Sequence, residues 1–89
     1  MLDQTPKIPN YEIISPLGSG TSGQVWLAKD RFGERRAIKM AHIDHISSSD
    51  YQRRFRREVR AQQQLYEVSS HVARIFDYDE KHIPPYIVM

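Results

Sequence analysis

The residues whose types and spacing are best suited to ligand chemistry are a run of glycines and a single lysine downstream of it. Gly18, Gly20 and Gly23 have the spacing G-x-G-x-x-G, and Lys39 lies in the sequence "AIKM". Glycine has no Cβ, so backbone N–H groups in such a run can come close to phosphate oxygens. A lysine ammonium nearby can neutralise phosphate charge. The alternative is a flexible turn between two strands, and the glycine spacing alone leaves both interpretations open.

The segments on either side of the glycines alternate like strands. In residues 11–17 the apolar residues Tyr11, Ile13 and Leu17 fall on odd positions. Val25 and Leu27 in "QVWLAKD" (24–30) continue the same parity. In dinucleotide-binding folds the same glycine spacing opens a helix, and this sequence has no helix start at that point. We therefore expect a strand, a glycine-rich loop over residues 18–23 and a second strand.

A third strand is expected over residues 35–41, and it carries the lysine. Because side chains alternate between the two faces of a strand, Lys39 shares a face with Ala37, across from Val25 and Leu17. Such a face combines a small apolar ceiling, which suits a flat adenine ring, with a cation that suits a triphosphate. The alternative is a solvated lysine on a strand, which is common in proteins.

An amphipathic helix is expected over residues 50–67. The run Ser47, Ser48, Ser49 and Asp50 supplies favourable N-cap residues. Steps of three and four positions then connect one face of the helix, which consists of Tyr51, Phe55, Val59, Gln62 and Tyr66, with Glu58 and Leu65 beside it.

Glu58 is the acidic residue of interest on this helix, because it lies between Phe55 and Val59 on the flank that should be buried. An unpaired carboxylate there is costly, and a lysine from the third strand could pair with it. The alternative is a surface glutamate paired within the helix, with Arg54 or Gln62. The sequence leaves these two interpretations open.

The last part of the chain predicts two more strands, in "VARIFDYD" (72–79) and in "PPYIVM" (84–89), the second ending at Met89. The predicted fold class is therefore α+β: a five-stranded antiparallel sheet with one packed helix.

The length and composition of the chain are those of a globular domain. The length of 89 residues fits one domain, and a content of 39% hydrophobic and 27% charged residues is typical of globular proteins. The absence of cysteine excludes disulfides and thiolate metal sites. No stretch approaches the roughly 20 apolar residues of a membrane span.

Taken in order, these segments resemble the N-terminal lobe of a eukaryotic-type (Hanks-type) Ser/Thr protein kinase, and they are similar to bacterial members of that family. "LGSGTSGQV" resembles the glycine-rich loop, "AIK" the third-strand motif, and "RFRREV" the helix that the family calls αC. The resemblance covers residues 11–89 and leaves residues 1–10 as an N-terminal lead-in.

The resemblance implies ATP as the cofactor and gives each residue of the site a role. Lys39 would contact the α- and β-phosphates and Glu58 would pair with it, while Met89 would be the gatekeeper at the end of the fifth strand. Leu17, Val25 and Ala37 would enclose the adenine. The loop that covers the phosphates would consist of Gly18, Ser19, Gly20, Thr21, Ser22 and Gly23. The full-length parent would transfer phosphate from ATP to hydroxyls of a protein substrate.

Two family motifs do not occur in these 89 residues: the catalytic loop H-R-D-x-x-x-x-N and the D-F-G that holds Mg²⁺. Both belong to the second lobe, together with the substrate site and the Mg²⁺ ligands. We therefore expect the chain alone to bind ATP weakly, to hold no metal and to be catalytically inactive. The alternatives are a stand-alone regulatory or interaction module and half of a pseudokinase. The open lobe face predicts self-association, and the expected location is cytoplasmic, or a cytosolic domain of a membrane-anchored kinase.

Three further features carry alternatives. Gln62 stands where the family usually has an apolar residue, which predicts either a regulated helix or a shifted helix register. The arginines of "RRFRREVR" (53–60) could bind nucleic acid, but they lack interleaved aromatic residues, so a solvated helix face is the favoured interpretation and no nucleic-acid partner is expected. His42 and His45 have a metal-compatible spacing, but the sequence offers no evident third ligand.

Overall fold

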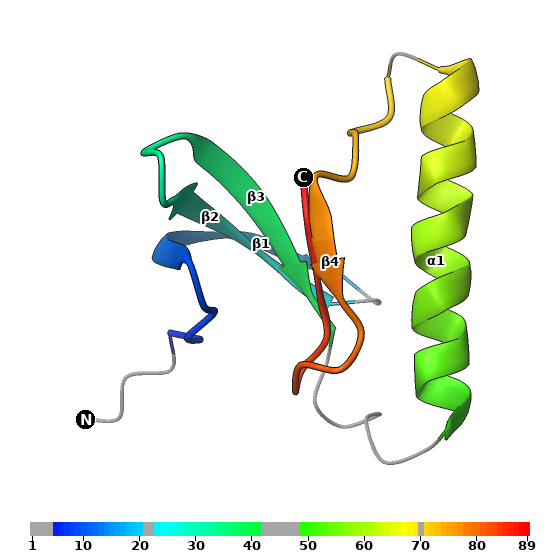
Figure 1. Cartoon of the computed structure of the whole chain (residues 1–89), viewed down its shortest axis with the longest axis horizontal. Helices are drawn as coiled ribbons and strands as arrows, with labels where there is room; N and C mark the ends of the chain where they lie inside the picture. The colour runs from blue at the N-terminus through cyan, green and yellow to red at the C-terminus, as the bar shows by residue number, and fades with distance from the viewer. Residues whose placement is uncertain (1–4, 21–22, 42–48, 70) are drawn as a thin grey trace.

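The computed structural model describes residues 5–20, 23–41, 49–69 and 71–89, and the side chains of residues 49–51 lie outside that description. The elements are β1 (Tyr11–Gly20), β2 (Gly23–Asp30), β3 (Arg35–Met40), α1 (Ser49–Val68), β4 (Asp77–Asp79) and β5 (Tyr86–Val88). All five strands form one antiparallel sheet in the order β1-β2-β3-β5-β4. Helix α1 stands beside the β4 end of this sheet (Figure 1). The predicted fold class is thus confirmed.

Some elements differ in length from the ranges expected from the sequence. Helix α1 is one residue longer at each end than 50–67, and the N-cap candidates Ser47 and Ser48 lie outside the described residues. The expected strand over 72–79 is reduced to Asp77–Asp79, because only these residues pair in register with β5. Sheet hydrogen bonds still continue past the strand ends: the N–H of Phe76 donates to the carbonyl of Val88 at 2.7 Å.

The main core lies on the sheet face away from α1. Alternation along β3 sends Ile38 and Met40 to this face, where they pack with Ala28, Tyr86 and Val88. The cluster also contains Ile8, from the N-terminal lead-in. The other residues packed against it are partly buried: Tyr11, Ile13 and Trp26.

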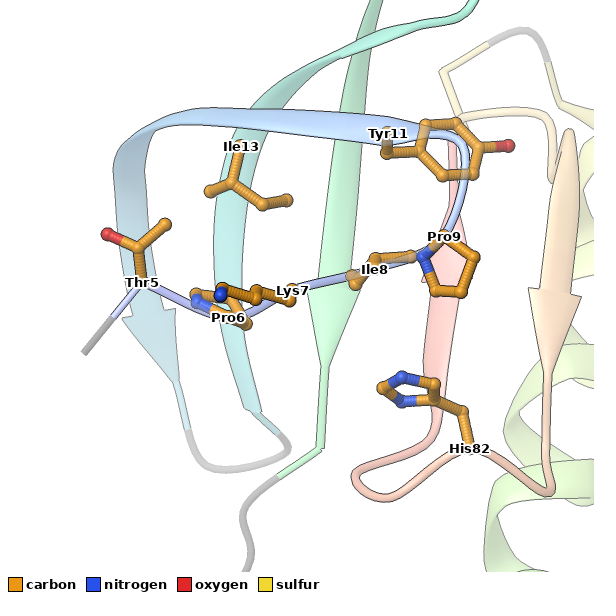
Figure 2. A pocket seen from close by; sticks show the side chains of 8 residues that line it. All are labelled: Thr5, Pro6, Lys7, Ile8, Pro9, Tyr11, Ile13 and His82. Atoms are coloured by element: carbon orange, nitrogen blue, oxygen red, sulfur yellow. The ribbon is translucent and has the colours of Figure 1, made fainter. Parts of the chain in front are cut away.

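The lead-in is therefore part of the packed structure. Ile8 is only 4% exposed, and its carbonyl accepts a hydrogen bond of 3.2 Å from the N–H of Tyr11. Figure 2 shows the segment from Thr5 to Pro9 running across the strands, where it lines a pocket together with Tyr11, Ile13 and His82. The sequence did not indicate this packing, because one isoleucine between two prolines has no periodicity.

A second, smaller cluster joins α1 to the other face of the sheet. It consists of Phe55 and Val59 from the helix and Ile87 from β5, with Ile75 and Met89 packed against it. All three residues of β5 are buried, because Ile87 points to this cluster while its neighbours point to the main core. The same strand therefore anchors both layers of the domain.

Candidate functional site

The glycine run lies at the closed end of the β1–β2 hairpin. Gly18 pairs with Val25 and Gly20 with Gly23, so the strands run almost to the tip, where an extended loop was expected over residues 18–23. Thr21 and Ser22, which were predicted to contact phosphate, lie outside the described residues. The described residues of the glycine run, 18–20 and 23, belong to the two paired strands β1 and β2. The strand pairing fixes the direction of their N–H groups.

The three glycines differ in whether the packing of the protein requires glycine at their position. A Cβ added at Gly18 or Gly20 would meet no protein atom within 4 Å. A Cβ added at Gly23 would lie 2.0 Å from the carbonyl oxygen of Met40, and the φ of Gly23 is +155°. The protein's own packing therefore requires glycine at position 23. It leaves positions 18 and 20 open toward solvent, where a ligand can approach the backbone.

Lys39 stands opposite Val25 on one side and Ile87 on the other, on the sheet face that meets α1. Its ammonium forms an ion pair with the carboxylate of Glu58, whose side chain is 36% exposed, against 24% for the lysine. The structure thus shows the cross-layer pair rather than the local alternatives for Glu58, which were Arg54 and Gln62. The reason is geometric, since Glu58 follows Phe55 on the helix face that packs against the sheet.

A pocket of about 490 Å³ lies under the glycine hairpin, with Lys39 contributing its cation. All the residues that line it were predicted as site residues from the sequence: Leu17, Gly18, Ser19, Gly20, Gly23, Val25 and Lys39. Leu17 is 58% exposed, and it lies where the pairing of β1 with β2 shifts register, between Pro16 and Gly18. The pocket combines backbone, apolar side chains and one positive charge.

Ala37 and Met89, the two remaining described site predictions, do not line this pocket. They pair with each other: the N–H of Met89 donates to the carbonyl of Ala37 at 2.7 Å, and the N–H of Ala37 donates back at 3.1 Å. Ala37 is two residues from Lys39 and opposite Leu27, on the same face of the sheet. Ala37 therefore lies on β3 two residues from Lys39 of the pocket, and Met89, just past β5, lies beside Ala37.

Two further contacts hold α1 in place, and sequence analysis did not anticipate their partners. Arg56 forms an ion pair with Glu80 in the turn between β4 and β5, and the hydrogen bond to this carboxylate raises the pKa of Arg56. Gln62 donates a hydrogen bond from Nε2 to the carbonyl of Ala73 at 3.0 Å. Neither Glu80 nor Ala73 belongs to a sequence motif, so no pattern could have identified them.

The other candidate features contribute less. The side chains of Arg53, Arg54, Arg57 and Arg60 are exposed along α1. His42 and His45 lie outside the described residues, and the described part of the chain contains no group of three or more His, Cys, Asp or Glu arranged to hold a metal ion. Among the described helical residues, no segment is long and apolar enough to cross a membrane.

Comparison with known proteins identifies the relatives of this chain. No family model matches the sequence. The probable serine/threonine-protein kinase PkwA of Thermomonospora curvata is 32% identical over 81 residues, which are 91% of this chain and 11% of that protein. Serine/threonine-protein kinase A of Synechocystis is 35% identical, covering 88% of this chain and 16% of the relative. PrkC of Bacillus subtilis is 34% identical, covering 89% and 12%.

The solved kinase domain of Mycobacterium tuberculosis PknI has the same fold, with a TM-score of 0.69 at 23% sequence identity. The match covers 100% of this chain and 36% of that domain. The predicted resemblance is therefore confirmed: over most of its length the chain is homologous to bacterial Ser/Thr protein kinases. It spans between 11% and 16% of the curated relatives.

Proposed function

We propose that this chain is the ATP-binding lobe of a Ser/Thr protein kinase. The observation that carries the proposal is the ion pair between Lys39 and Glu58 at the inner end of the glycine-hairpin pocket. An ammonium held by an ion pair, beside glycine backbone that is open to solvent, is the combination that suits a polyphosphate. Backbone N–H groups and the ammonium can then share the negative charge of the phosphates. Homology to bacterial Ser/Thr kinases supports the same proposal.

Each group in the pocket has a distinct task in this proposal. The backbone of Gly18 and Gly20 covers the phosphates, because no Cβ and no neighbouring protein atom obstructs that approach. Lys39 binds the α- and β-phosphates, and Glu58 keeps its ammonium at the inner end of the pocket. Leu17 and Val25 enclose one side of the adenine, continued by Ala37, with Met89 as the gatekeeper beyond it.

Bound ATP supplies the phosphoryl group for transfer to a protein hydroxyl in a full-length kinase. The residues of this chain bind and orient the nucleotide in that reaction. Removal of the hydroxyl proton and coordination of Mg²⁺ require the H-R-D and D-F-G motifs, which do not occur in these 89 residues. We therefore propose that the chain alone binds ATP without transferring phosphate.

The experiment that tests this function measures ATP binding to the wild-type chain and to Lys39→Ala by titration calorimetry. Loss of one charge-assisted hydrogen bond weakens binding by about 10-fold or more. The matched control is Lys29→Ala, which removes an exposed lysine from the neighbouring strand β2 and should leave affinity unchanged. Wild-type chain that binds no ATP at millimolar concentration, or equal losses in both variants, would overturn the proposal.

The proposal includes partners and location. The protein substrate binds through the second lobe, and the location is cytoplasmic or on the cytosolic side of a membrane-anchored kinase.

We also propose that the chain alone self-associates through its exposed apolar residues on the pocket side, of which Leu17 is 58% exposed. Sedimentation velocity over a roughly 100-fold range of protein concentration tests self-association. A sedimentation coefficient that does not change with concentration would contradict self-association.

A further inference from the structure

Gln62 connects helix α1 to the segment that leads into β4. Its side-chain Nε2 donates a hydrogen bond of 3.0 Å to the carbonyl oxygen of Ala73, 11 positions further along the chain. Gln62 is partly buried, whereas its neighbours Gln63 and Gln64 are exposed. Among three consecutive glutamines, the one that turns toward the body of the domain thus has a defined partner.

Gln62 lies at the point where the apolar contact between α1 and the sheet stops. Phe55 and Val59 are buried in the second cluster, at 5% and 4% exposed, but the next apolar residues on the helix, Leu65 and Tyr66, are 53% and 42% exposed. Gln62 follows Val59 by three positions and Glu58 by four, so it shares their face of the helix. A directional polar contact therefore continues the helix attachment where apolar packing ends.

The partner of Gln62 lies just before residues that are fixed to the sheet. Ile75, two residues after Ala73, packs against the cluster of Phe55, Val59 and Ile87. The next residue, Phe76, donates its N–H to the carbonyl of Val88 at 2.7 Å. Beyond Val88, Met89 pairs through its backbone with Ala37 on β3, the strand that carries Lys39. The carbonyl of Ala73 thus lies two to three residues before the point where the chain joins the sheet that carries the lysine.

We propose that Gln62 is a positioning residue, which sets the place of α1 against the sheet and thereby holds Glu58 at Lys39. This inference rests on the proposed function, in which that ion pair orients ATP. The Lys39–Glu58 ion pair is partly exposed, and the apolar contact is confined to two helix residues. The Arg56–Glu80 ion pair is made from the N-terminal half of the helix, so Gln62 supplies the contact on the C-terminal side of the apolar packing. A hydrogen bond suits this place because it depends on direction, whereas apolar packing tolerates sliding.

The test uses Gln62→Met, which keeps the length and the helix propensity of the side chain but removes the donor. The matched control is Gln63→Met, the same change at the exposed neighbour. The first measurement is amide hydrogen exchange of the chain without nucleotide. We expect exchange about 3- to 10-fold faster in residues 62–68 and 71–76 of Gln62→Met, with unchanged rates in β2 and β3 and in the control. Uniform acceleration across the sheet, or no change in those two segments, would overturn the proposal.

The second measurement separates positioning from general stability, by determining ATP affinity in two backgrounds. If Gln62 acts through Glu58, Gln62→Met weakens ATP binding about 3- to 10-fold in the wild-type background and has no effect when Glu58→Gln is already present. Equal losses in both backgrounds would overturn the proposed route through Glu58. If even the wild-type chain binds no ATP, the proposed function fails, and hydrogen exchange still decides whether Gln62 fixes the helix.

Discussion

The ammonium of Lys39 on β3 and the carboxylate of Glu58 on α1 meet across the boundary between the sheet and the helix. The two residues are separated by the whole connection from β3 into α1, and the packing of Phe55 and Val59 on Ile87, together with the polar contacts of Arg56 and Gln62, brings them together. Because both side chains are partly exposed, water screens their attraction, and such pairs contribute about 0–1 kcal/mol to stability. The pair therefore matters for where the cation is held more than for folding.

Neutralising Glu58 tests this distinction. We expect Glu58→Gln to change the free energy of unfolding by less than about 1 kcal/mol, yet to weaken ATP binding several-fold, because the lysine ammonium loses its fixed position. Chemical denaturation and calorimetric titration measure the two quantities. Glu67→Gln, near the exposed end of α1, is the matched control and should change neither. A large loss of stability without a loss of affinity would contradict the assignment.

The glycines of the hairpin should separate into a structural and a functional kind. Gly23→Ala places a Cβ against the backbone carbonyl of Met40 and should destabilise the domain by about 2 kcal/mol or more. Gly18→Ala has open space and should leave thermal stability nearly unchanged while weakening ATP binding. Thermal unfolding and nucleotide titration of both variants check this, and the prediction fails if Gly18→Ala binds ATP as tightly as the wild type.

The N-terminal lead-in should contribute to stability through one side chain. Ile8→Ala removes most of a 4% exposed side chain from the main core, which should cost about 2–4 kcal/mol. Ile14→Ala makes the same change at a residue that is 45% exposed and should cost much less. Urea denaturation of the two variants gives the comparison, and similar midpoints would show that the lead-in does not pack in solution.

Asp30 should make stability depend on acid pH. Partial burial raises the pKa of Asp30, but hydrogen bonds from the N–H groups of Glu34 and Phe32 and from the Arg36 guanidinium outweigh it, so the pKa lies below its ordinary value of 3.8. A carboxyl with a lowered folded-state pKa stabilises the fold above its ordinary value and loses that contribution as pH falls through the folded-state pKa.

The measurement for Asp30 compares the unfolding free energies of the wild type and Asp30→Asn between pH 6 and pH 2.5. The wild type should be more stable at pH 6, and the difference should shrink as pH falls below the ordinary pKa of 3.8 and through the lower folded-state pKa of Asp30. A difference that stays constant over the whole range would show that the charge of Asp30 contributes nothing to the β2–β3 turn.

Much of the candidate site could be predicted from the sequence, because its residues belong to local patterns. Alternation placed Lys39 and Ala37 on one face of a strand, and the apolar steps of Phe55 and Val59 placed Glu58 near the inner side of a helix. The role of Glu58 could not be derived this way, since a surface glutamate with a partner four positions away produces the same pattern. The register shift at Leu17 was also hidden, because an irregularity in strand pairing has no signature in one strand's sequence.

The sequence by itself determined the kinds of element and their order, because strand and helix periodicities are properties of neighbouring residues. It also indicated which residues share a face on β2, β3 and α1, but not on β1, where register shifts place Tyr11 and Ile13 on the main core and Leu17 at the pocket. Only the tertiary structure decided the contacts between elements: Lys39 with Glu58, Arg56 with Glu80, Gln62 with the Ala73 carbonyl, and Ile8 with the sheet. These contacts depend on how the helix and the lead-in are placed against the sheet, and that placement results from burial of apolar surface by the whole chain.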